Sequence, residues 1–369
     1  MTPSGSGDAA RPRPARRPTI KDIARQAGVS ESAVSFALND RPGVSAQTRA
    51  RVRRVAEKLG WQANSAARAL SGERAGSLGL VLARPAHTLG IESFFLQLVS
   101  GIQEVLATRR TALLFQVVED LDAECEVYRR WWAERRVDGV LVVDPRTEDP
   151  RPELLVSLGL PAVVVGEPAT AQGHPAGPAI STVWADDSRA MARVLDHLYD
   201  LGHRRIVHVA GLPGLAHTAR RISSLRAEAG RRGLGEDQVR SVTTDYSDAE
   251  GAEATRRILD GPEPPTAIIY DNDVMAVAGV SVAAERGVPV PARLAIVAWD
   301  DSPLCRVTHP RLTALVRDTP GFGRLAAQEL LAVLDGAPVR SVQGELPHLE
   351  PRESTAAPAY DGDPAPSAR

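Results

Sequence analysis

Basic side chains, which neutralise phosphate, are concentrated at one end of this sequence. Residues 1–76 hold 14 Arg and Lys against 6 Asp and Glu, a net charge of +8. The rest of the chain holds 30 against 40, so the overall charge of −2 for 369 residues conceals a basic head on an acidic body. Such an asymmetry indicates that the head meets a polyanion such as nucleic acid.

Polar residues at the start of a short helix are placed to contact that polyanion. Two helices joined at Ala27–Ser30 fit a helix-turn-helix, whose second helix enters the DNA major groove. Glu31, Ser32 and Ser35 would then face base edges or phosphates. A helical hairpin that binds no DNA has the same spacing, and the basic charge argues against it. A third helix carries a row of arginines that either contact phosphates or form a solvated face: Arg49, Arg51, Arg53 and Arg54.

The residue types that enzymes use for catalysis and phosphate binding occur in this sequence without the spacing that such sites require. The stretch Gly211–Gly214 has only two glycines and no phosphate-loop pattern, and the eight histidines are scattered without metal-ligand spacing. Cys125 and Cys305 are far apart in the sequence, and we expect both to be buried free thiols. In the pairs Asp186–Asp187 and Asp300–Asp301 the carboxylates point apart, so we expect one of each to face a ligand and the other to be structural. We therefore expect no enzyme, no metal and no cofactor.

Three short helices must position the polar residues of the head. Apolar residues recur at helical spacing over residues 19–60. Thr19, Ser30 and Ser45 are expected to cap the helices, and Gly28 and Gly60 to end the first and the third. This predicts an all-α DNA-binding domain over residues 19–62. A disordered basic arm over residues 1–18 precedes it, and a connector over residues 63–74 follows it.

From residue 78 onward, apolar runs alternate with amphipathic helical segments. The runs are 78–82, 112–117, 139–143, 161–165, 205–209, 266–270 and 294–298. Strands this uniformly apolar are buried on both faces, as in parallel α/β sheets. A Pro/Gly-rich break at residues 168–178 separates two groups of runs, which predicts two lobes with a ligand cleft between them.

The predicted core spans residues 77–350. Its first lobe covers about 77–180 with a return segment after residue 300, and its second covers about 181–298 with a C-terminal segment. Residues 351–369, rich in Pro, Ala and Ser, are predicted to form a disordered tail.

Several motifs occur together in a recognisable order. The head and connector contain Thr19–Ala24, Ala27–Ser30, Leu38–Asn39, Pro42–Ser45, Leu59–Gly60 and Asn64–Leu70. The core contains Phe94–Phe95, Leu201–Ile206, Asn272–Ala276, Trp299–Pro303 and Leu312–Thr313. In type and order these motifs resemble those of the lactose-repressor (LacI) family of bacterial transcription regulators, over roughly residues 19–345. The resemblance implies an all-α helix-turn-helix head and an α/β core with the two-lobed, periplasmic-binding-protein-like fold and its parallel sheets.

The resemblance also implies which residues contact DNA. In the head these are Thr19, Ser30, Glu31, Ser32, Ser35 and Asn39, and in a hinge helix they are Asn64, Ala67 and Leu70. Leu70 would wedge between base steps of the minor groove, the alternative being a leucine that only packs its helix. Two residues depart from the family pattern: Phe36 stands where an arginine is usual, and Ala63 replaces the proline that starts the hinge helix. The carboxylate of Glu31 could accept a hydrogen bond from the amino group of a cytosine.

A second set of residues is implied to bind a small effector in the core. This set is Phe94, Phe95, Glu167, Arg221, Asn272 and Asp300. A guanidinium donates hydrogen bonds and a carboxylate accepts them, which suits neighbouring sugar hydroxyls, and Phe94, Phe95 and Trp299 could stack on the ring. Glu167 is one residue away from the usual acidic contact. The alternatives are a surface ion pair for Arg221, a helix cap for Asn272 and core packing for the two phenylalanines.

Together these features predict a transcription regulator, which we expect to be a repressor. We expect a cytoplasmic, nucleoid-associated homodimer, or a tetramer, on a pseudopalindromic DNA operator, controlled by a sugar or sugar derivative. No signal peptide or apolar run of the ~20 residues needed to cross a membrane is present. Whether the effector induces or corepresses stays open. The alternative is a solute-binding protein with the same two-lobed fold and no transcriptional role, which would need an export signal and no DNA-binding head.

Overall fold

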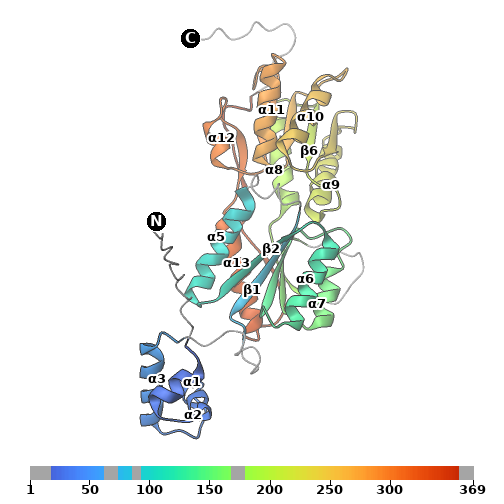
Figure 1. Ribbon diagram of the computed structural model, residues 1–369. Coiled ribbons are helices and arrows are strands. Elements are labelled where there is room, and N and C mark those ends of the chain that lie inside the picture. Colours follow the sequence, from blue (N-terminus) through green and yellow to red (C-terminus); the bar gives the residue numbers. More distant parts are fainter. Residues whose placement is uncertain (1–17, 62–73, 85–92, 168–178, 357–369) are drawn as a thin grey trace, which may run out of the picture. The chain divides into compact units, whose positions relative to one another are not determined.

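The computed structural model describes residues 18–61, 74–84, 93–167 and 179–356 (Figure 1). The chain divides into two compact units, Met1–Glu73 and Arg74–Arg369. The predicted basic arm, apart from Pro18, lies outside the described residues. So do the hinge residues Asn64, Ala67 and Leu70.

The head is a bundle of three helices, as predicted. They are α1 (Ile20–Ala27), α2 (Glu31–Leu38) and α3 (Ala46–Lys58). The side chains of Thr19, Ser30 and Ser45 each accept a hydrogen bond from the backbone N–H three residues on, so all three predicted caps are confirmed. Gly28 ends α1 in the left-handed conformation, at φ 65°. The helices bury a small apolar core: Ile23, Ala24, Ala27, Val34, Ala37, Val52 and Ala56.

Within the described residues, the core holds two six-stranded sheets. The first has the order β11 (Ser341–Gln343), β5 (Ser181–Trp184), β4 (Ala162–Val165), β3 (Gly139–Val143), β1 (Ser77–Ala83) and β2 (Ala112–Val118), with every neighbouring pair parallel. The second has the order β12 (His348–Glu350), β10 (Thr313–Val316), β9 (Ala295–Ala298), β8 (Ala267–Tyr270), β6 (Ile206–Ala210) and β7 (Val239–Thr243). Only the β10–β12 pair is antiparallel there.

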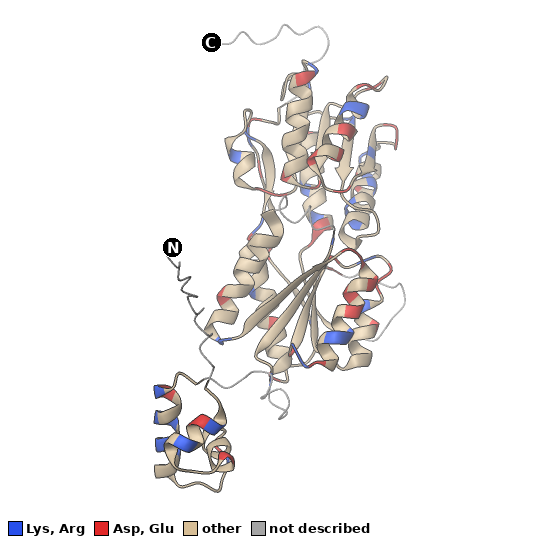
Figure 2. Cartoon of the chain, viewed as in Figure 1, with Lys and Arg blue, Asp and Glu red and all other residues tan. Residues whose placement is uncertain are grey.

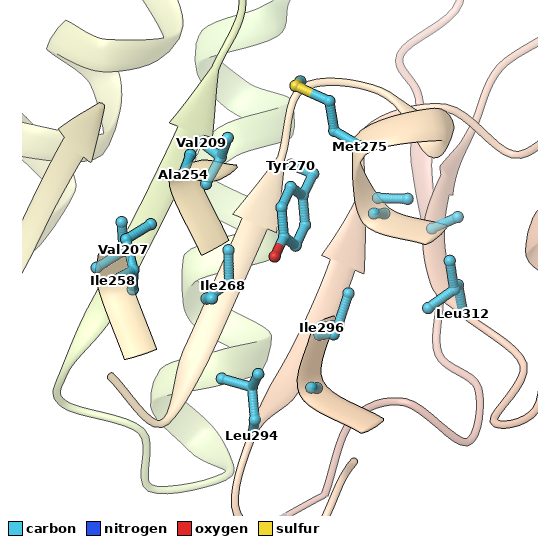
Figure 3. Packing of buried hydrophobic residues seen from close by; sticks show 14 of the residues in the cluster. Val207, Val209, Ala254, Ile258, Ile268, Tyr270, Met275, Leu294, Ile296 and Leu312 are labelled. Atoms are coloured by element: carbon cyan, nitrogen blue, oxygen red, sulfur yellow. The ribbon is translucent and has the colours of Figure 1, made fainter. Parts of the chain in front are cut away.

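Helices cover both faces of each sheet, which explains why the strands are uniformly apolar. The first sheet packs against α5 (Ser93–Thr108) and α13 (Thr319–Leu334) on one face. Its other face packs against α6 (Leu121–Ala133) and α7 (Arg151–Leu158). One face of the second sheet packs against α8 (Asp187–Asp200) and α9 (Ala216–Arg231). Its other face packs against α10 (Asp248–Leu259), α11 (Asp273–Glu285) and α12 (Pro303–Val307). Figure 3 shows the latter face, where Tyr270 is buried among aliphatic side chains.

The lobe boundaries differ from those predicted. Strand β5 belongs to the first sheet, so the first lobe extends to Trp184 rather than to about 180. Strand β10 belongs to the second sheet, so the segment after residue 300 first completes the second lobe before α13 returns to the first. Both strands begin with polar residues, Ser181 and Thr182 in β5 and Thr313 in β10, so neither matches the uniformly apolar runs on which the prediction depended.

The predicted disordered tail is wrong for residues 351–356. Ser354 is fully buried, its Oγ donates to the carbonyl of Ile296 at 2.6 Å, and it accepts from the N–H of Thr313 at 2.8 Å. Arg352 binds the carboxylate of Asp301 at 2.7 Å. These are polar contacts to a distant sheet, which the local composition does not reveal. The remainder of the predicted tail lies outside the described residues.

Candidate functional site

A cavity of about 90 Å³ lies between the two lobes, where loops follow the carboxyl ends of the strands. The structure brings all six predicted effector residues to its wall. They are Phe94, Phe95, Glu167, Arg221, Asn272 and Asp300. The first three belong to the first lobe and the other three to the second. Residues separated by up to 206 positions in the chain therefore meet at one site.

Arg221, on α9, is buried rather than at the surface, since its side chain is only 7% exposed. Its Nη1 lies 3.0 Å from the carboxylate of Asp271, and its Nε lies 3.5 Å from that of Asp187. The guanidinium also lies over the indole of Trp299, 4.2 Å from the ring centroid. Burial disfavours the charged guanidinium, but the carboxylates of Asp187 and Asp271 outweigh it and raise the pKa of Arg221. Arg221 is thus a fixed cation, and Trp299 lies beneath it instead of lining the cavity.

Asp271 holds Arg221 in place. It is fully buried at the end of β8, where one carboxylate oxygen accepts from both Arg221 and the Nε2 of His208, each at 3.0 Å. The other oxygen accepts from the N–H of Gly211 at 2.9 Å. Burial raises the pKa of this carboxyl, but Arg221 and His208 outweigh it and hold the pKa well below its usual range. Asp271 is therefore a rigid carboxylate that the sequence prediction did not include.

The two pairs of neighbouring aspartates divide their roles as predicted. Asp300 lines the cavity, with Arg317 Nε 3.7 Å away, and burial raises the pKa of its carboxyl. Asp301 instead binds Arg352 and Arg306 outside the cavity. In the other pair, Asp187 lines the cavity and Asp186 caps α8 through the N–H of Arg189.

Asn272 combines the two interpretations that the sequence left open. Its side-chain oxygen accepts from the N–H of Met275 at 2.8 Å and so caps α11. Its Nδ2 donates to the carbonyl of Tyr246 at 2.9 Å. The same side chain lines the cavity, so the cap fixes the orientation in which it faces a ligand.

The two phenylalanines pack edge to face, with ring centroids 5.4 Å apart. Phe95 is buried in the first-lobe core and Phe94 is half-buried, so both packing and a cavity role apply. The guanidinium of Arg84 lies between the rings of Phe95 and Tyr246, 5.1 and 5.0 Å from their centroids. Its Nε binds Asp144 at 2.8 Å. Aromatic and charged groups of both lobes therefore alternate along one wall.

Glu167 connects the lobes as well as lining the cavity. Its carboxylate lies 3.0 Å from Arg220 Nε on α9, and Arg220 also donates to its backbone carbonyl at 3.0 Å. Burial raises the pKa of the Glu167 carboxyl. Nearby, the N–H of Thr147 donates to the carbonyl of Gly214 at 2.9 Å, across the same junction. The lobes are in direct contact at this edge of the cavity.

Several cavity residues were missed by the sequence prediction: Arg84, Asp144, Tyr246, Asp271, Arg317 and His217. Four of them, Arg84, Asp144, Asp271 and Arg317, come directly after strands β1, β3, β8 and β10. Charged residues immediately after apolar strands were therefore a usable signal, because ligands of α/β folds bind at the carboxyl ends of strands. Tyr246 and His217 follow no strand directly and gave no such signal.

The polar residues of the head share one side of α2. Glu31 and Ser32 are exposed at its start, Ser35 is half-buried, and Asn39 is exposed at its end. Their spacing places them along one face of a helix. Thr19 and Ser30 are exposed at the caps of α1 and α2. Phe36, which replaces the arginine usual in the family, is 37% exposed, and its ring lies beside Gly43. The residue therefore makes an apolar contact within the head.

Basic residues recur along α3, as the colouring of Figure 2 shows. Two of the predicted arginines are ion-paired: Arg49 and Arg53 both bind Asp40. The hydrogen bond from Arg49 is the main cause that lowers the pKa of the Asp40 carboxyl. Arg51 and Arg54 are exposed. The row is therefore divided between an ion-paired half and a solvated half.

The comparison with known proteins agrees with this geometry. Residues 19–64 match the family described as bacterial regulatory proteins, lacI family, and residues 195–355 match a periplasmic binding protein-like domain. The transcriptional regulator CelR of Thermobifida fusca is 30% identical, over 92% of this chain and 98% of its own length. The regulator MalR of Streptomyces coelicolor is 32% identical, over 94% and 99%. The chain belongs to the lacI family of bacterial regulatory proteins.

A solved structure extends the match to three dimensions. The complex of CelR with cellobiose is 29% identical, covers 92% of this chain and all of its own, and superposes with a TM-score of 0.68. As a lacI-family member, the chain is a DNA-binding regulator of transcription, and the named relatives are regulators rather than enzymes. In its described part, no helix is long and apolar enough to cross a membrane, and no cluster of three or more His, Cys, Asp or Glu side chains could hold a metal ion.

The absence of a side chain at Gly211 leaves space for the ring of Tyr246, which lines the cavity. Tyr246 has a left-handed backbone, at φ 72°, and its hydroxyl bonds to His217 Nε2 at 2.8 Å. A Cβ on residue 211 would lie 1.7 Å from its ring. Gly211→Ala should therefore displace the ring and lower the free energy of unfolding by about 1–3 kcal/mol, measured by urea denaturation. Gly230→Ala, at an exposed helical site with open space around it, should cost nothing; equal stability of both variants would contradict the packing argument.

Proposed function

We propose that this regulator is a repressor that binds a pseudopalindromic operator as a homodimer and releases it when a small sugar enters the cavity. The observation that carries the proposal is the convergence of the six effector residues on one site between the lobes. A relative solved with cellobiose has the same fold, and the ribose operon repressor of Escherichia coli is 26% identical over 85% of this chain. The proposal includes a cytoplasmic location, on the chromosome, and no catalytic activity.

Donors and acceptors in the cavity suit a polyhydroxylated ring. The Asp300 carboxylate can accept from one hydroxyl while Arg221 donates to its neighbour, and the Phe94 ring offers an apolar surface to the C–H face of a sugar. Asn272 would add a donor from the cap of α11. Each of these groups is held by partners of its own, so little side-chain freedom is lost when the ligand binds.

The size of the cavity connects binding to a change of lobe closure. Drug-sized ligands occupy pockets of roughly 300–1,000 Å³. At about 90 Å³ the cavity is below that range while Glu167 binds Arg220 across the junction. In the proposal, the sugar binds more tightly to a second arrangement of the lobes. This difference in affinity between the two arrangements is what allows the ligand to shift their equilibrium. The second arrangement weakens the pairing of the two hinges on DNA, so the sugar is an inducer.

On the DNA side, the proposal assigns base and phosphate contacts to the exposed face of α2 and its caps. These residues are Thr19, Ser30, Glu31, Ser32, Ser35 and Asn39. The proposed hinge contacts Asn64, Ala67 and Leu70 rest on family membership alone. Pairing of two heads on a pseudopalindrome would mirror the twofold symmetry of the dimer.

Asp300→Asn should separate effector binding from DNA binding. It removes a charged acceptor, worth about 1.5–3 kcal/mol for a charged hydrogen bond, so the sugar concentration that releases the operator should rise at least about tenfold. Operator affinity without sugar should stay unchanged. The measurement is fluorescence anisotropy of a labelled operator, selected from random DNA, titrated with glucose, ribose, maltose or cellobiose.

Asp301→Asn is the matched control, because the neighbouring carboxylate binds Arg352 and Arg306 outside the cavity. Its sugar response should be that of the original chain. Unchanged sugar affinity of Asp300→Asn in calorimetry would show the site assignment to be wrong. A sugar that strengthens operator binding would identify a corepressor, and sugar binding without any operator binding would favour a solute-binding role.

A further inference from the structure

The wall of the cavity carries more negative than positive charge. Among the described residues that line it, the carboxylates are Asp144, Glu167, Asp187, Asp271 and Asp300, and the guanidinium groups are those of Arg84, Arg221 and Arg317. His217 also lines it, but burial lowers its pKa to about 4, so it is neutral at physiological pH. Because Arg220 binds Glu167 from outside the wall at 3.0 Å, an excess of one negative charge remains.

Every guanidinium group on this wall already has a carboxylate partner. Arg84 Nε lies 2.8 Å from Asp144, and Arg317 Nε lies 3.7 Å from Asp300. Arg221 faces two carboxylates, Asp271 at 3.0 Å and Asp187 at 3.5 Å. The excess negative charge is thus concentrated at the arginine that the family resemblance assigns to the effector.

Both carboxylates beside Arg221 are buried, and Asp271 is also held by hydrogen bonds. Asp271 is fully buried and bound by His208 and by the N–H of Gly211. Asp187 is 7% exposed in the first turn of α8. An incoming phosphate or carboxylate would approach Arg221 only by coming close to both carboxylates. In a buried site of low dielectric constant, that repulsion is stronger than in water.

The charges of these arginines are paired, but their hydrogen bonds are incomplete. Arg221 Nε, Arg317 Nε and Arg317 Nη2 are buried and make no hydrogen bond within the described residues. A hydroxyl oxygen of an uncharged ligand can accept from such a donor. The hydroxyl can in turn donate to a carboxylate, which an anionic group cannot do.

We propose that the cavity selects uncharged sugars and excludes phosphorylated and acidic ones, and that Asp187 and Asp271 impose this choice by both pairing with Arg221. The proposal rests on the proposed function, because it specifies the charge of the effector at the same site. Asp187 and Asp271 act here as specificity-determining residues, and Asp271 also positions Arg221.

The first experiment is calorimetry on the full chain with pairs of an uncharged sugar and its anionic derivative. The pairs are glucose with glucose 6-phosphate, ribose with ribose 5-phosphate, cellobiose with cellobionate, and maltose with maltobionate. The expected result is that at least one uncharged sugar binds and that its anionic counterpart binds at least tenfold more weakly. An anionic sugar that binds as tightly as its counterpart overturns this inference and leaves the proposed function standing. If no sugar of either kind binds, the proposed function is overturned, and the inference with it.

The second experiment uses Asp187→Asn, which keeps the shape of the side chain and removes one of the two negative charges at Arg221. The affinity for the anionic member, relative to its uncharged counterpart, should rise about tenfold. Asp186→Asn is the control: it removes the same charge one residue away, at a position that caps α8 and does not line the cavity, and asparagine caps helices equally well. Thermal melts of both variants confirm folding. An equal change of selectivity in both would overturn the assignment to the Asp187–Arg221 pair.

Discussion

Replacing Arg221 by alanine should lower the free energy of unfolding of the core by about 3–5 kcal/mol, because the substitution leaves two carboxylates buried without their cation. Asp271 is fully buried and Asp187 nearly so, and Arg221 is the guanidinium closest to both. Urea denaturation followed by circular dichroism measures the change. At temperatures where the variant is folded, sugar binding should be lost while operator affinity is kept.

Arg226→Ala provides a matched control on the same helix. Arg226 binds Glu236, both side chains being more than 70% exposed, and such surface pairs contribute about 0–1 kcal/mol. The double variant Arg221→Ala with Asp271→Asn should recover part of the lost stability, because it removes one unpaired charge. A stability of Arg221→Ala within 1 kcal/mol of the original chain would contradict the buried-network interpretation.

The effect of Arg221→Ala should also depend on pH. In the original chain the pKa of Asp271 is depressed, so the ion pair contributes stability above the unfolded pKa of about 4, and this contribution is lost as the pH falls. In the variant the carboxyls can take up protons in the folded state. The difference in stability between the two proteins should therefore be largest near pH 7 and become smaller below pH 5.

Leu70→Ala should lower operator affinity about 100-fold and change affinity for non-operator DNA by less than about threefold. This prediction follows from family membership and from the place of Leu70 at the end of the Asn64–Leu70 motif, outside the described residues. Truncating an apolar wedge costs about 1.5 kcal/mol for each of two subunits, or roughly a hundredfold in total. Anisotropy titrations with operator and scrambled duplexes measure both affinities.

Arg68→Ala, two residues earlier, is the comparison for Leu70→Ala. Loss of a cation near phosphates weakens binding to every sequence alike and reduces the salt dependence. Similar losses on both duplexes are therefore expected for Arg68→Ala. If Leu70→Ala also weakened both duplexes equally, Leu70 would be a packing residue and not a wedge.

Local signals in the sequence predicted the head in detail. The caps at Thr19, Ser30 and Ser45 bond backbone groups only three residues away, so residue type and spacing are sufficient to place them. The two-lobed α/β core also followed from the sequence, because strands covered by helices on both faces must be apolar throughout. The convergence of Arg221, Asn272 and Asp300 was implied by motif order and is present in the structure.

Non-local packing accounts for what the sequence did not reveal. The four-residue strands β5 and β10 take their places in the two sheets by pairing with neighbours, and Ser354 is buried through bonds to strands 41 and 58 residues earlier. The partners of Arg221 are likewise distant, 34 and 50 residues away in the chain.

Residue types thus predicted that this chain binds DNA with its basic head and a small polar ligand between its lobes. The charge that the ligand must have depends on which carboxylates share Arg221. That pairing is settled only where α8, α9 and the end of β8 come together, because electrostatic energy depends on distances that no local pattern contains.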